Sequence, residues 1–394
     1  MPRAQLQYLT DELNSLREQK LYLKLRILET KQLPVSRFDG REVINLSSNN
    51  YLGLTTHPKL EQRAIEAIEK YGVGSGAVRT IAGTMTLHMA LEEKIARFKH
   101  VEASVVFQSG FAANAGTVAA ILGKEDVIIS DALNHASIID GCRLSRAEIR
   151  VFPHKDLEAC EQILKDLESR KGRKLLITDG VFSMDGDIAP LPQLVELAEK
   201  YGSIMMIDDA HASGVLGRNG RGTVDHFNLH GRVDIQVGTL SKAIGALGGY
   251  VCSTTDVIDF LYHRARPFLF STSHPPSVAA TCIAALEVLE EQPQLVDRLW
   301  ANTRFFKAGL QKLGFDTGQS ETPITPVMVG EAALAHEFSR QLFQNGVFAM
   351  GIGYPTVAKG KARIRTIVTA THTEAELSRA LEIMGGVAKE LKLI

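Results

Sequence analysis

Two short motifs combine an acid pair, a histidine and a lysine at the ends of apolar runs. The first, IDDAH at residues 207–211, follows the run IMMI and contains Asp208. The second, TLSKAIGALGG at residues 239–249, follows the run IQVG and contains Lys242 before a glycine-rich loop. A lysine amine can form a Schiff base, and an acid can keep a pyridine nitrogen protonated so that the ring accepts electrons. The two motifs together therefore predict pyridoxal phosphate (PLP) chemistry.

Each residue also has a plainer interpretation. An isolated lysine such as Lys242 is most often a surface residue before a flexible loop. Asp208 and Asp209 could bind a metal or cap a helix, and we favour Asp208 as the partner of the pyridine nitrogen because it directly ends the apolar run. His135, in the segment SDALNHASIIDG, either caps a helix or stacks on a flat cofactor, and the residues alone leave both interpretations open.

Several small polar residues could hold the phosphate of such a cofactor. Thr239 and Ser241 can donate hydrogen bonds, and Ser109–Ala112 can present a helix N-terminus to the same anion. A lysine in this cationic, partly dry pocket can have a lowered pKa, so it can act as a nucleophile and a base. The loop GVGSG at residues 72–76 lacks GxGxxG spacing and a preceding apolar strand, so a tight loop near a substrate or subunit interface is favoured over a dinucleotide site.

Composition excludes several classes of partner. The 394 residues include 44 basic and 45 acidic side chains, which does not favour nucleic acid or a membrane surface. The four cysteines show no CxxC spacing, so neither a disulfide framework nor a metal site is expected. The N-terminus does not resemble a signal peptide, and no apolar run is long enough to span a bilayer. We expect a cytoplasmic protein.

The order of elements predicts an α/β fold. Short apolar runs alternate with helical stretches such as 156–169 and 192–201, as in a mostly parallel sheet. The predicted strands are 104–107, 126–130, 174–179, 203–208, 235–238 and 249–253. Ligands of such sheets bind beyond the carboxyl ends of the strands, where this sequence places Gln108–Gly110, Asp179, Asp208 and Thr239.

The predicted organisation has three parts. Residues 1–55 form an amphipathic helix over 5–19 and a hairpin with a turn at 38–41, residues 56–288 a large domain, and residues 289–394 a small α+β domain. A long helical stretch is predicted to follow Pro275-Pro276 and to stop at Gly314.

At this level of detail the chain resembles the α-oxoamine synthase family of fold-type-I PLP enzymes, which have an aspartate-aminotransferase-like fold. The resemblance covers essentially the whole chain in order, and its motifs are highly specific when taken together. They are NLSSNNYLGL (45–54), GSGAVRTIAGT (74–84), QSGFAAN (108–114), DALNHASIIDG (131–141), TDGVFSMDGDIAPL (178–191), IDDAHASGVLG (207–217), TLSKAIGALGGY (239–250), RPFLFSTSHPP (266–276) and GKARIRTIVTATHT (360–373).

The resemblance implies a role for each matching residue. Lys242 would hold PLP as a Schiff base, Asp208 would pair with the pyridine nitrogen, and His135 would stack on the ring. His211 and Ser183 would contact the ring oxygen. Gly110, Phe111 and Thr239 would hold the phosphate, and Ser271 and Thr272 would reach the phosphate of the partner subunit. Arg365 would bind the substrate carboxylate, with Asn50 nearby. His135 would also contact the substrate. Arg363 and Arg365 share one face of a strand, so only the motif match favours Arg365. The family resemblance also implies a homodimer with a shared active site and no metal.

The implied activity is an acyltransferase that condenses a small amino acid with an acyl-CoA. We expect glycine and acetyl-CoA, giving 2-amino-3-oxobutyrate (glycine C-acetyltransferase), with alanine and pimeloyl-CoA in biotin biosynthesis as the alternative, or an enzyme that catalyses both. An aminotransferase of the same fold is less favoured, because the His135 motif and the QSGFAAN loop match the synthases. A nicotinamide-dependent dehydrogenase would need a GxGxxG loop, and a catalytically silent subunit would be expected to lack Lys242.

Overall fold

The computed structural model describes residues 4–19 and 21–394 and contains two compact units. The larger unit comprises residues 49–183 and 187–298. The smaller unit comprises the described residues up to Ser48, together with Met184–Gly186 and Leu299–Ile394. The three-part division predicted from the sequence, with boundaries after residues 55 and 288, stays a prediction.

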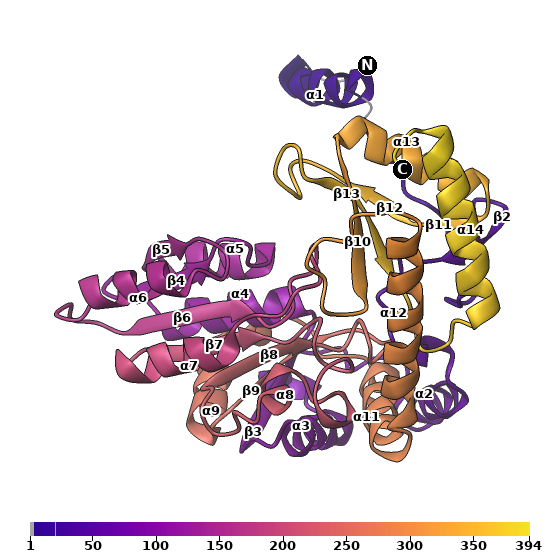
Figure 1. The fold of residues 1–394 in the computed structure, drawn as a ribbon. Helices are drawn as coiled ribbons and strands as arrows, with labels where there is room; N and C mark the ends of the chain where they lie inside the picture. The colour runs from indigo at the N-terminus through magenta and orange to yellow at the C-terminus, as the bar shows by residue number, and fades with distance from the viewer. Residues whose placement is uncertain (1–3, 20) are drawn as a thin grey trace. The chain divides into compact units, whose positions relative to one another are not determined.

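The larger unit is built on one seven-stranded sheet with the order β3-β9-β8-β7-β6-β4-β5, counted over the described residues (Figure 1). Strand β9 is antiparallel to both of its neighbours, and the other pairs are parallel. This confirms the predicted mostly parallel sheet. The strands are β3 (Ala103–Phe107), β4 (Val127–Asp131), β5 (Glu148–Phe152), β6 (Lys174–Asp179), β7 (Ile204–Asp208), β8 (Ile235–Thr239) and β9 (Gly249–Ser253).

Helices precede, separate and follow these strands along the chain. They are α2 (Pro58–Tyr71), α3 (Thr86–Lys99), α4 (Gly110–Ile121), α5 (Ala136–Ser145), α6 (Leu157–Asp166), α7 (Leu191–Lys200), α8 (Thr223–His226), α9 (Thr255–Arg264), α10 (Arg266–Leu269) and α11 (Pro276–Glu291). Residues of α4, α5, α6, α7 and α9 pack in the cores beside the sheet.

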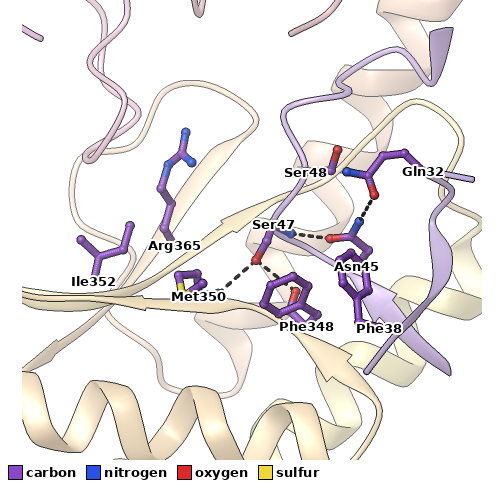
Figure 2. Close-up of a pocket in the computed structure, with 9 residues that line it drawn as sticks. All are labelled: Gln32, Phe38, Asn45, Ser47, Ser48, Phe348, Met350, Ile352 and Arg365. Atoms are coloured by element: carbon purple, nitrogen blue, oxygen red, sulfur yellow. Dashed lines mark hydrogen bonds between the residues drawn. The ribbon is translucent and has the colours of Figure 1, made fainter. Parts of the chain in front are cut away.

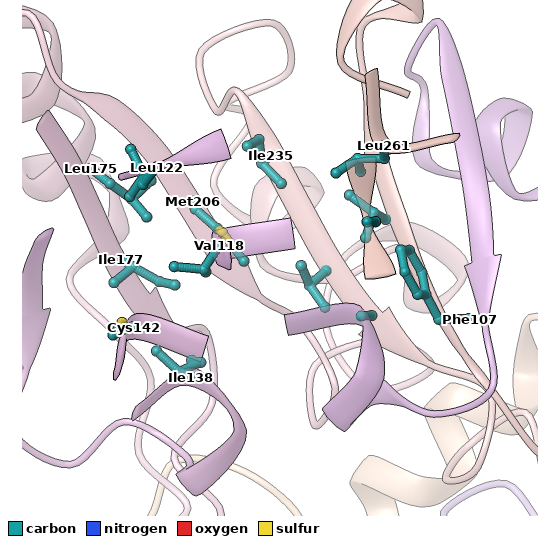
Figure 3. Close-up of a cluster of buried hydrophobic side chains, with 14 of the residues drawn as sticks. Phe107, Val118, Leu122, Ile138, Cys142, Leu175, Ile177, Met206, Ile235 and Leu261 are labelled. Carbon is teal, nitrogen blue, oxygen red and sulfur yellow. The ribbon is translucent and has the colours of Figure 1, made fainter. Parts of the chain in front are cut away.

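The core of the larger unit forms two apolar clusters from alternating strand residues. Met206 and Ile177 belong to one cluster, with residues of α4, α5 and α9 (Figure 3). Their chain neighbours Met205 and Leu176 belong to the other, with residues of α6 and α7. Successive side chains of a strand point to opposite faces, so a sheet covered on both faces needs continuous apolar runs. This requirement explains why the strands of the sheet other than β5 were recognisable in the sequence.

The smaller unit contains two three-stranded sheets among its described residues, with orders β1-β2-β11 and β10-β13-β12. The predicted hairpin is confirmed, and Asp39 and Gly40 both have positive φ, as a tight hairpin turn requires. The elements are α1 (Gln7–Glu18), β1 (Val35–Phe38), β2 (Arg41–Asn45), β10 (Ile324–Gly330), α13 (Ala332–Gln344), β11 (Val347–Phe348), β12 (Met350–Ile352), β13 (Ala362–Ile367) and α14 (Glu374–Glu390).

The prediction of one long helix after Pro275-Pro276 is wrong. The structure has two helices there, because α11 ends at Glu291 and α12 (Gln294–Lys312) begins after Pro293. Proline lacks a backbone N–H and cannot continue the hydrogen-bond ladder of a helix. The stop at Gly314 is confirmed, since α12 ends at Lys312 and Gly314 has a φ of 97°. No helix of the described residues is long and apolar enough to cross a membrane.

Candidate active site

The site begins where three neighbouring parallel strands end. Strands β6, β7 and β8 end at Asp179, Asp208 and Thr239, and Asp179 pairs directly with Asp208 in the sheet register. All three residues are buried. The expectation that these polar groups meet at one edge of the sheet is therefore confirmed.

Both oxygens of the Asp208 carboxylate accept a hydrogen bond from the protein. The Asn114 side-chain amide donates to Oδ2 over 2.6 Å, and the backbone N–H of Ala210 donates to Oδ1 over 2.8 Å. Asn114 is itself buried in α4 and also donates to the Ser137 hydroxyl over 2.9 Å. These bonds fix the orientation of Asp208. Asn114 is the last residue of the QSGFAAN motif, so the family resemblance marked its position although its role was not predicted.

Asp179 is the second carboxylate of the site; it was expected at a strand end where ligands bind, but no role was predicted for it. One of its oxygens accepts the backbone N–H of His135 over 2.7 Å. Burial raises its pKa well above the ordinary value, and the charge of Asp208 raises it further, while the Lys242 ammonium acts in the opposite direction. Two buried carboxylates side by side favour a cation between or beside them.

Asp209 has a different set of partners and a structural role. The Lys99 ammonium lies 2.7 Å from its Oδ2, and the Thr223 hydroxyl donates to its Oδ1 over 2.5 Å. The side chains of Lys99 and Asp209 are almost completely buried. Because these contacts occupy both oxygens of Asp209, Asp208 alone of the pair faces Asn114. Among the described residues no group of histidines, cysteines and acids could hold a metal ion.

His135 caps a helix, and it also belongs to the cluster around Lys242. Its Nδ1 lies 2.7 Å from the Ser137 hydroxyl and accepts the Ser137 backbone N–H at the start of α5. Loss of hydration lowers the pKa of His135, with the Asp208 charge raising it and the Lys242 charge lowering it. Lys242 is therefore close enough to act electrostatically on both His135 and Asp179. The helix-capping interpretation of His135 is confirmed; stacking on a cofactor stays a prediction.

His211 is held by a tyrosine that sequence reasoning missed. The Tyr51 hydroxyl lies 2.8 Å from Nδ1 of His211, and both residues are buried. Tyr51 lies inside the NLSSNNYLGL motif, so its position was marked by the family resemblance although its role was not. Its neighbour Asn50 is buried and donates from Nδ2 to the Thr55 hydroxyl over 2.7 Å. Ser183 is half-buried in the same unit.

The predicted phosphate-binding residues meet at the start of α4. Ser109 caps this helix by accepting the Ala112 N–H over 3.0 Å, and Gly110 is its first residue. A Cβ atom on Gly110 would lie 3.4 Å from the Cβ of Thr239, so the N-terminus of α4 lies in van der Waals contact with the end of β8. Phe111 follows it and is exposed. The helix N-terminus and nearby hydroxyls can bind an anion.

Ser271 and Thr272 lie in a loop beside the end of β3. The side-chain amide of Gln108 donates to the carbonyl of Thr272 over 2.7 Å. Thr272 also forms an isolated bridge with Val78. Thr272 is exposed and Ser271 is half-buried in the single chain. Their contact with a partner subunit stays a prediction.

The two candidate arginines of β13 differ in their surroundings. Arg363 is buried and its guanidinium bonds to Asp185 over 2.5 Å and to the Met184 carbonyl over 3.0 Å. Arg365 lines a pocket of about 280 Å³ in the smaller unit, with Asn45 and Ser47 among its neighbours (Figure 2). An arginine that lines a pocket can bind a substrate carboxylate, whereas the Arg363 guanidinium is buried against Asp185 and does not line this pocket. This favours Arg365, as the motif match did.

The residues of the larger unit fit PLP. The buried carboxylates Asp208 and Asp179 suit a protonated pyridine nitrogen, and Lys242 acts on the same cluster. The N-terminus of α4 and the hydroxyl of Thr239 suit a phosphate.

Comparison with known proteins settles the family. A family model described as aminotransferase class I and II matches residues 41–384. The chain belongs to this family. It is 60% identical to an 8-amino-7-oxononanoate synthase of Symbiobacterium thermophilum over 98% of this chain and 99% of that protein. It is 56% identical to 8-amino-7-oxononanoate synthase 1 of Bacillus subtilis, with 99% of each chain covered.

Solved structures agree with this assignment. A serine palmitoyltransferase from S. paucimobilis with a bound PLP–myriocin aldimine superposes with a TM-score of 0.94 at 32% identity, with 99% of each chain covered. An 8-amino-7-oxononanoate synthase from Francisella tularensis superposes with a TM-score of 0.76 at 29% identity, covering 89% of this chain and 99% of that chain. The protein is thus a PLP-dependent α-oxoamine synthase with the fold-type-I architecture.

The comparisons support the stated alternative for the substrates better than the pair that was expected first. Glycine and acetyl-CoA were the pair expected first, but none of these relatives is named for that reaction. The stated alternative, alanine with pimeloyl-CoA, matches their names. Motifs that bind the cofactor and the amino acid do not report the shape of the acyl pocket, so they could not distinguish the two pairs of substrates.

Proposed function

We propose that this protein is an 8-amino-7-oxononanoate synthase that joins alanine to pimeloyl-CoA in biotin biosynthesis, releasing CoA and CO₂. The observation that carries the proposal is the shared name of relatives that are 54–60% identical over 98–99% of the chain. The cluster of Lys242, Asp208, Asp179 and His135 supplies the groups that such a reaction needs.

The structure of the product defines both substrates. In 8-amino-7-oxononanoate the amino group is on C8 and the ketone on C7, so C8 and the C9 methyl come from alanine after its carboxylate leaves as CO₂. The remaining seven carbons, including the C7 ketone and the terminal carboxylate, come from the pimeloyl group. Glycine with acetyl-CoA would instead give a four-carbon amino ketoacid. The proposed function therefore requires a site that accepts the Cβ methyl of the amino acid and a long acyl group with a terminal carboxylate.

Lys242 and Asp208 are the residues closest to the chemistry in this proposal. Bound PLP supplies an electron sink for the negative charge that develops when the Cα proton leaves. We propose that Lys242 carries the cofactor and, once the amino acid has replaced it, removes that proton. Asp208, fixed by Asn114 and Ala210, keeps the pyridine nitrogen protonated. Asn114 acts through Asp208 and is therefore a positioning residue.

The remaining residues bind and orient. We propose that Arg365 and Asn50 hold the carboxylate of alanine, and that His135 covers the ring and contacts the substrate. His211, fixed by Tyr51, and Ser183 would donate to the ring oxygen. Gly110, Phe111 and Thr239 would hold the phosphate.

We further propose that the protein acts as a cytoplasmic homodimer, with Ser271 and Thr272 of each subunit reaching the phosphate of the other. The four buried free cysteines suit a reducing compartment. The partly exposed loop at Ser271 and Thr272 suits a contact from outside the chain.

Isotope tracing tests the proposed function. The PLP-loaded protein is incubated with pimeloyl-CoA and alanine labelled in its carboxyl carbon. The proposal predicts stoichiometric labelled CO₂ and an unlabelled product with the mass of 8-amino-7-oxononanoate. Lys242→Ala, which removes the amine that holds the cofactor, serves as the control and should release neither. Absence of labelled CO₂ from the wild-type protein would contradict the proposal.

A further inference from the structure

The larger unit has a pocket whose lining residues have no role in the proposed reaction. Its volume is about 480 Å³, and it lies where the loop before α8 meets the end of α3. Basic side chains dominate its lining, with one acid, Asp225. They are His100, Arg218, Arg221, His226 and His230.

Asp225, the single acid of the lining, already forms hydrogen bonds with two other residues of the pocket. Nε2 of His230 lies 3.0 Å from Oδ1 of Asp225, and the backbone N–H of Arg218 donates to its Oδ2 over 2.5 Å. These bonds help to hold the pKa of Asp225 below its ordinary value although burial opposes this. Asp225 therefore shapes the loop as an ionised group, and two guanidinium groups and further imidazoles remain to face a ligand.

Contacts with Phe98 and Lys99 at the end of α3 hold Arg221 in place. Its Nε donates to the Phe98 carbonyl over 3.0 Å, and its guanidinium carbon lies 5.6 Å from the centre of the Phe98 ring. The buried Lys99 ammonium donates to the Arg221 carbonyl over 2.5 Å. A cation that the fold already positions loses little freedom when it binds an anion.

Arg218 is the adaptable partner on the other side of the loop. Its side chain is exposed, and its guanidinium has no hydrogen bond or ion pair with any residue that the structure describes. Two glycines flank the segment that carries the two arginines, Gly217 before Arg218 and Gly222 after Arg221. A Cβ atom on Gly217 would lie 2.7 Å from the Gly222 carbonyl, and one on Gly222 would lie 2.0 Å from the Asp209 carboxylate. The loop is therefore locked against the Lys99–Asp209 pair.

We propose that this pocket binds a phosphate group. Arginine forks match the oxygens of a phosphate and stay charged at all relevant pH values. A metal is not the favoured occupant, because within residues 4–19 and 21–394 no group of histidines, cysteines and acids fits one. The pocket has room for more than an inorganic phosphate ion, so a phosphate ester of a nucleoside is a second source of the same chemistry. The proposal does not depend on which acyl-CoA the enzyme uses.

Calorimetric titration of the PLP-loaded protein tests this site. Inorganic phosphate and adenosine 3′,5′-bisphosphate are titrated separately, and the absorbance of the cofactor is followed so that PLP displacement is seen. We expect saturable binding of at least one of them without loss of PLP. If only the bisphosphate binds, the source is a nucleotide; if both bind with similar affinity, the phosphate group alone is recognised.

Variants link this binding to the pocket. Arg218→Gln with His226→Gln removes two exposed groups and spares the bonds of Arg221 and Asp225. This double variant should weaken binding at least about tenfold, the effect expected when a charged hydrogen-bond donor is lost. Arg379→Gln, on the exposed face of α14, is the control and should bind as the wild type does. No binding to the wild-type protein, or equal affinity in the double variant, would overturn the proposal.

Discussion

Asp208 and Asp209 are consecutive residues whose carboxylates bind different partners. Asp208 accepts hydrogen bonds from Asn114 and Ala210, whereas Asp209 pairs with the buried Lys99 ammonium and with Thr223. One acid is therefore placed for the cofactor and the other for the fold. Substituting each of them should separate activity from stability.

Asp209→Asn should destabilise the fold by about 3–5 kcal/mol, because it leaves the buried charge of Lys99 without its counter-ion. Asp208→Asn loses one of the two hydrogen bonds that the carboxylate accepts, so it should lower the free energy of unfolding by only about 1–2 kcal/mol. It should lower kcat at least about a hundredfold, since an amide cannot hold the pyridine nitrogen protonated. Urea unfolding and steady-state rates of CoA release measure the two effects. Equal losses of stability in both variants would refute the division of roles.

Asn114→Ala should lower kcat by about tenfold to a hundredfold, because Asp208 loses the donor that orients it. The pH profile of kcat should change as well, which a purely structural defect would not cause. Thr117→Val is the matched control in the same helix. Thr117 is buried, and its hydroxyl has no hydrogen-bond partner among the described residues, so the replacement should be nearly neutral. Equal kcat values in the two variants would exclude the positioning role of Asn114.

The strands that carry the site residues could be predicted from the sequence, whereas the residues that hold those side chains in place could not. Buried strands β4, β6, β7 and β8 are continuous apolar runs, so their ends, and therefore Asp179, Asp208 and Thr239, could be located. Strand β5 was missed because Glu148 and Arg150 interrupt its apolar residues, so Glu148–Phe152 (EIRVF) is no continuous apolar run, and most of it is exposed at the edge of the sheet. An edge strand buries too little to require an apolar run.

The supporting residues of the site depend on tertiary contacts, which local patterns do not encode. Asn114 and Tyr51 reach Asp208 and His211 across 94 and 160 positions of the chain. Nothing in the composition of their own segments indicates these partners. The break at Pro293 was visible in the sequence, but the apolar periodicity on both sides of it resembled that of one helix.

His154 provides a prediction about pH. Burial opposes its charge, but hydrogen bonds to Asp131 and Asp187 outweigh this and raise the pKa of His154 from 6.5 to about 9. Because the folded pKa is the higher one, the stabilisation is complete below the unfolded value of 6.5 and is lost as the pH rises through about 9. It amounts to at most about 3 kcal/mol.

His154→Gln should therefore have a lower free energy of unfolding than the wild type near pH 6.5. Between about pH 6.5 and 9 its stability should fall less steeply with rising pH than that of the wild type. Urea midpoints measured at several pH values test this, with His263→Gln on the exposed surface of α9 as the control. An unchanged slope in His154→Gln would mean that another group titrates.

Arg363 and Arg365 provide a matched pair for the substrate carboxylate. Arg365→Gln should raise the KM for the amino acid at least about tenfold, because a charged donor to the carboxylate is lost, and should leave the fold intact. Arg363→Gln breaks the bonds to Asp185 and Met184, so we expect lower stability and a nearly unchanged KM. The reverse pattern would assign the carboxylate to Arg363.

The substrates are the central claim, and a matrix of amino acids and acyl-CoA thioesters tests them most directly. CoA release by the PLP-loaded protein is measured as kcat/KM for alanine and glycine, each with pimeloyl-CoA and with acetyl-CoA. The account predicts that alanine with pimeloyl-CoA exceeds every other pair. A higher kcat/KM for glycine with acetyl-CoA, or no CoA release with any pair, would contradict it.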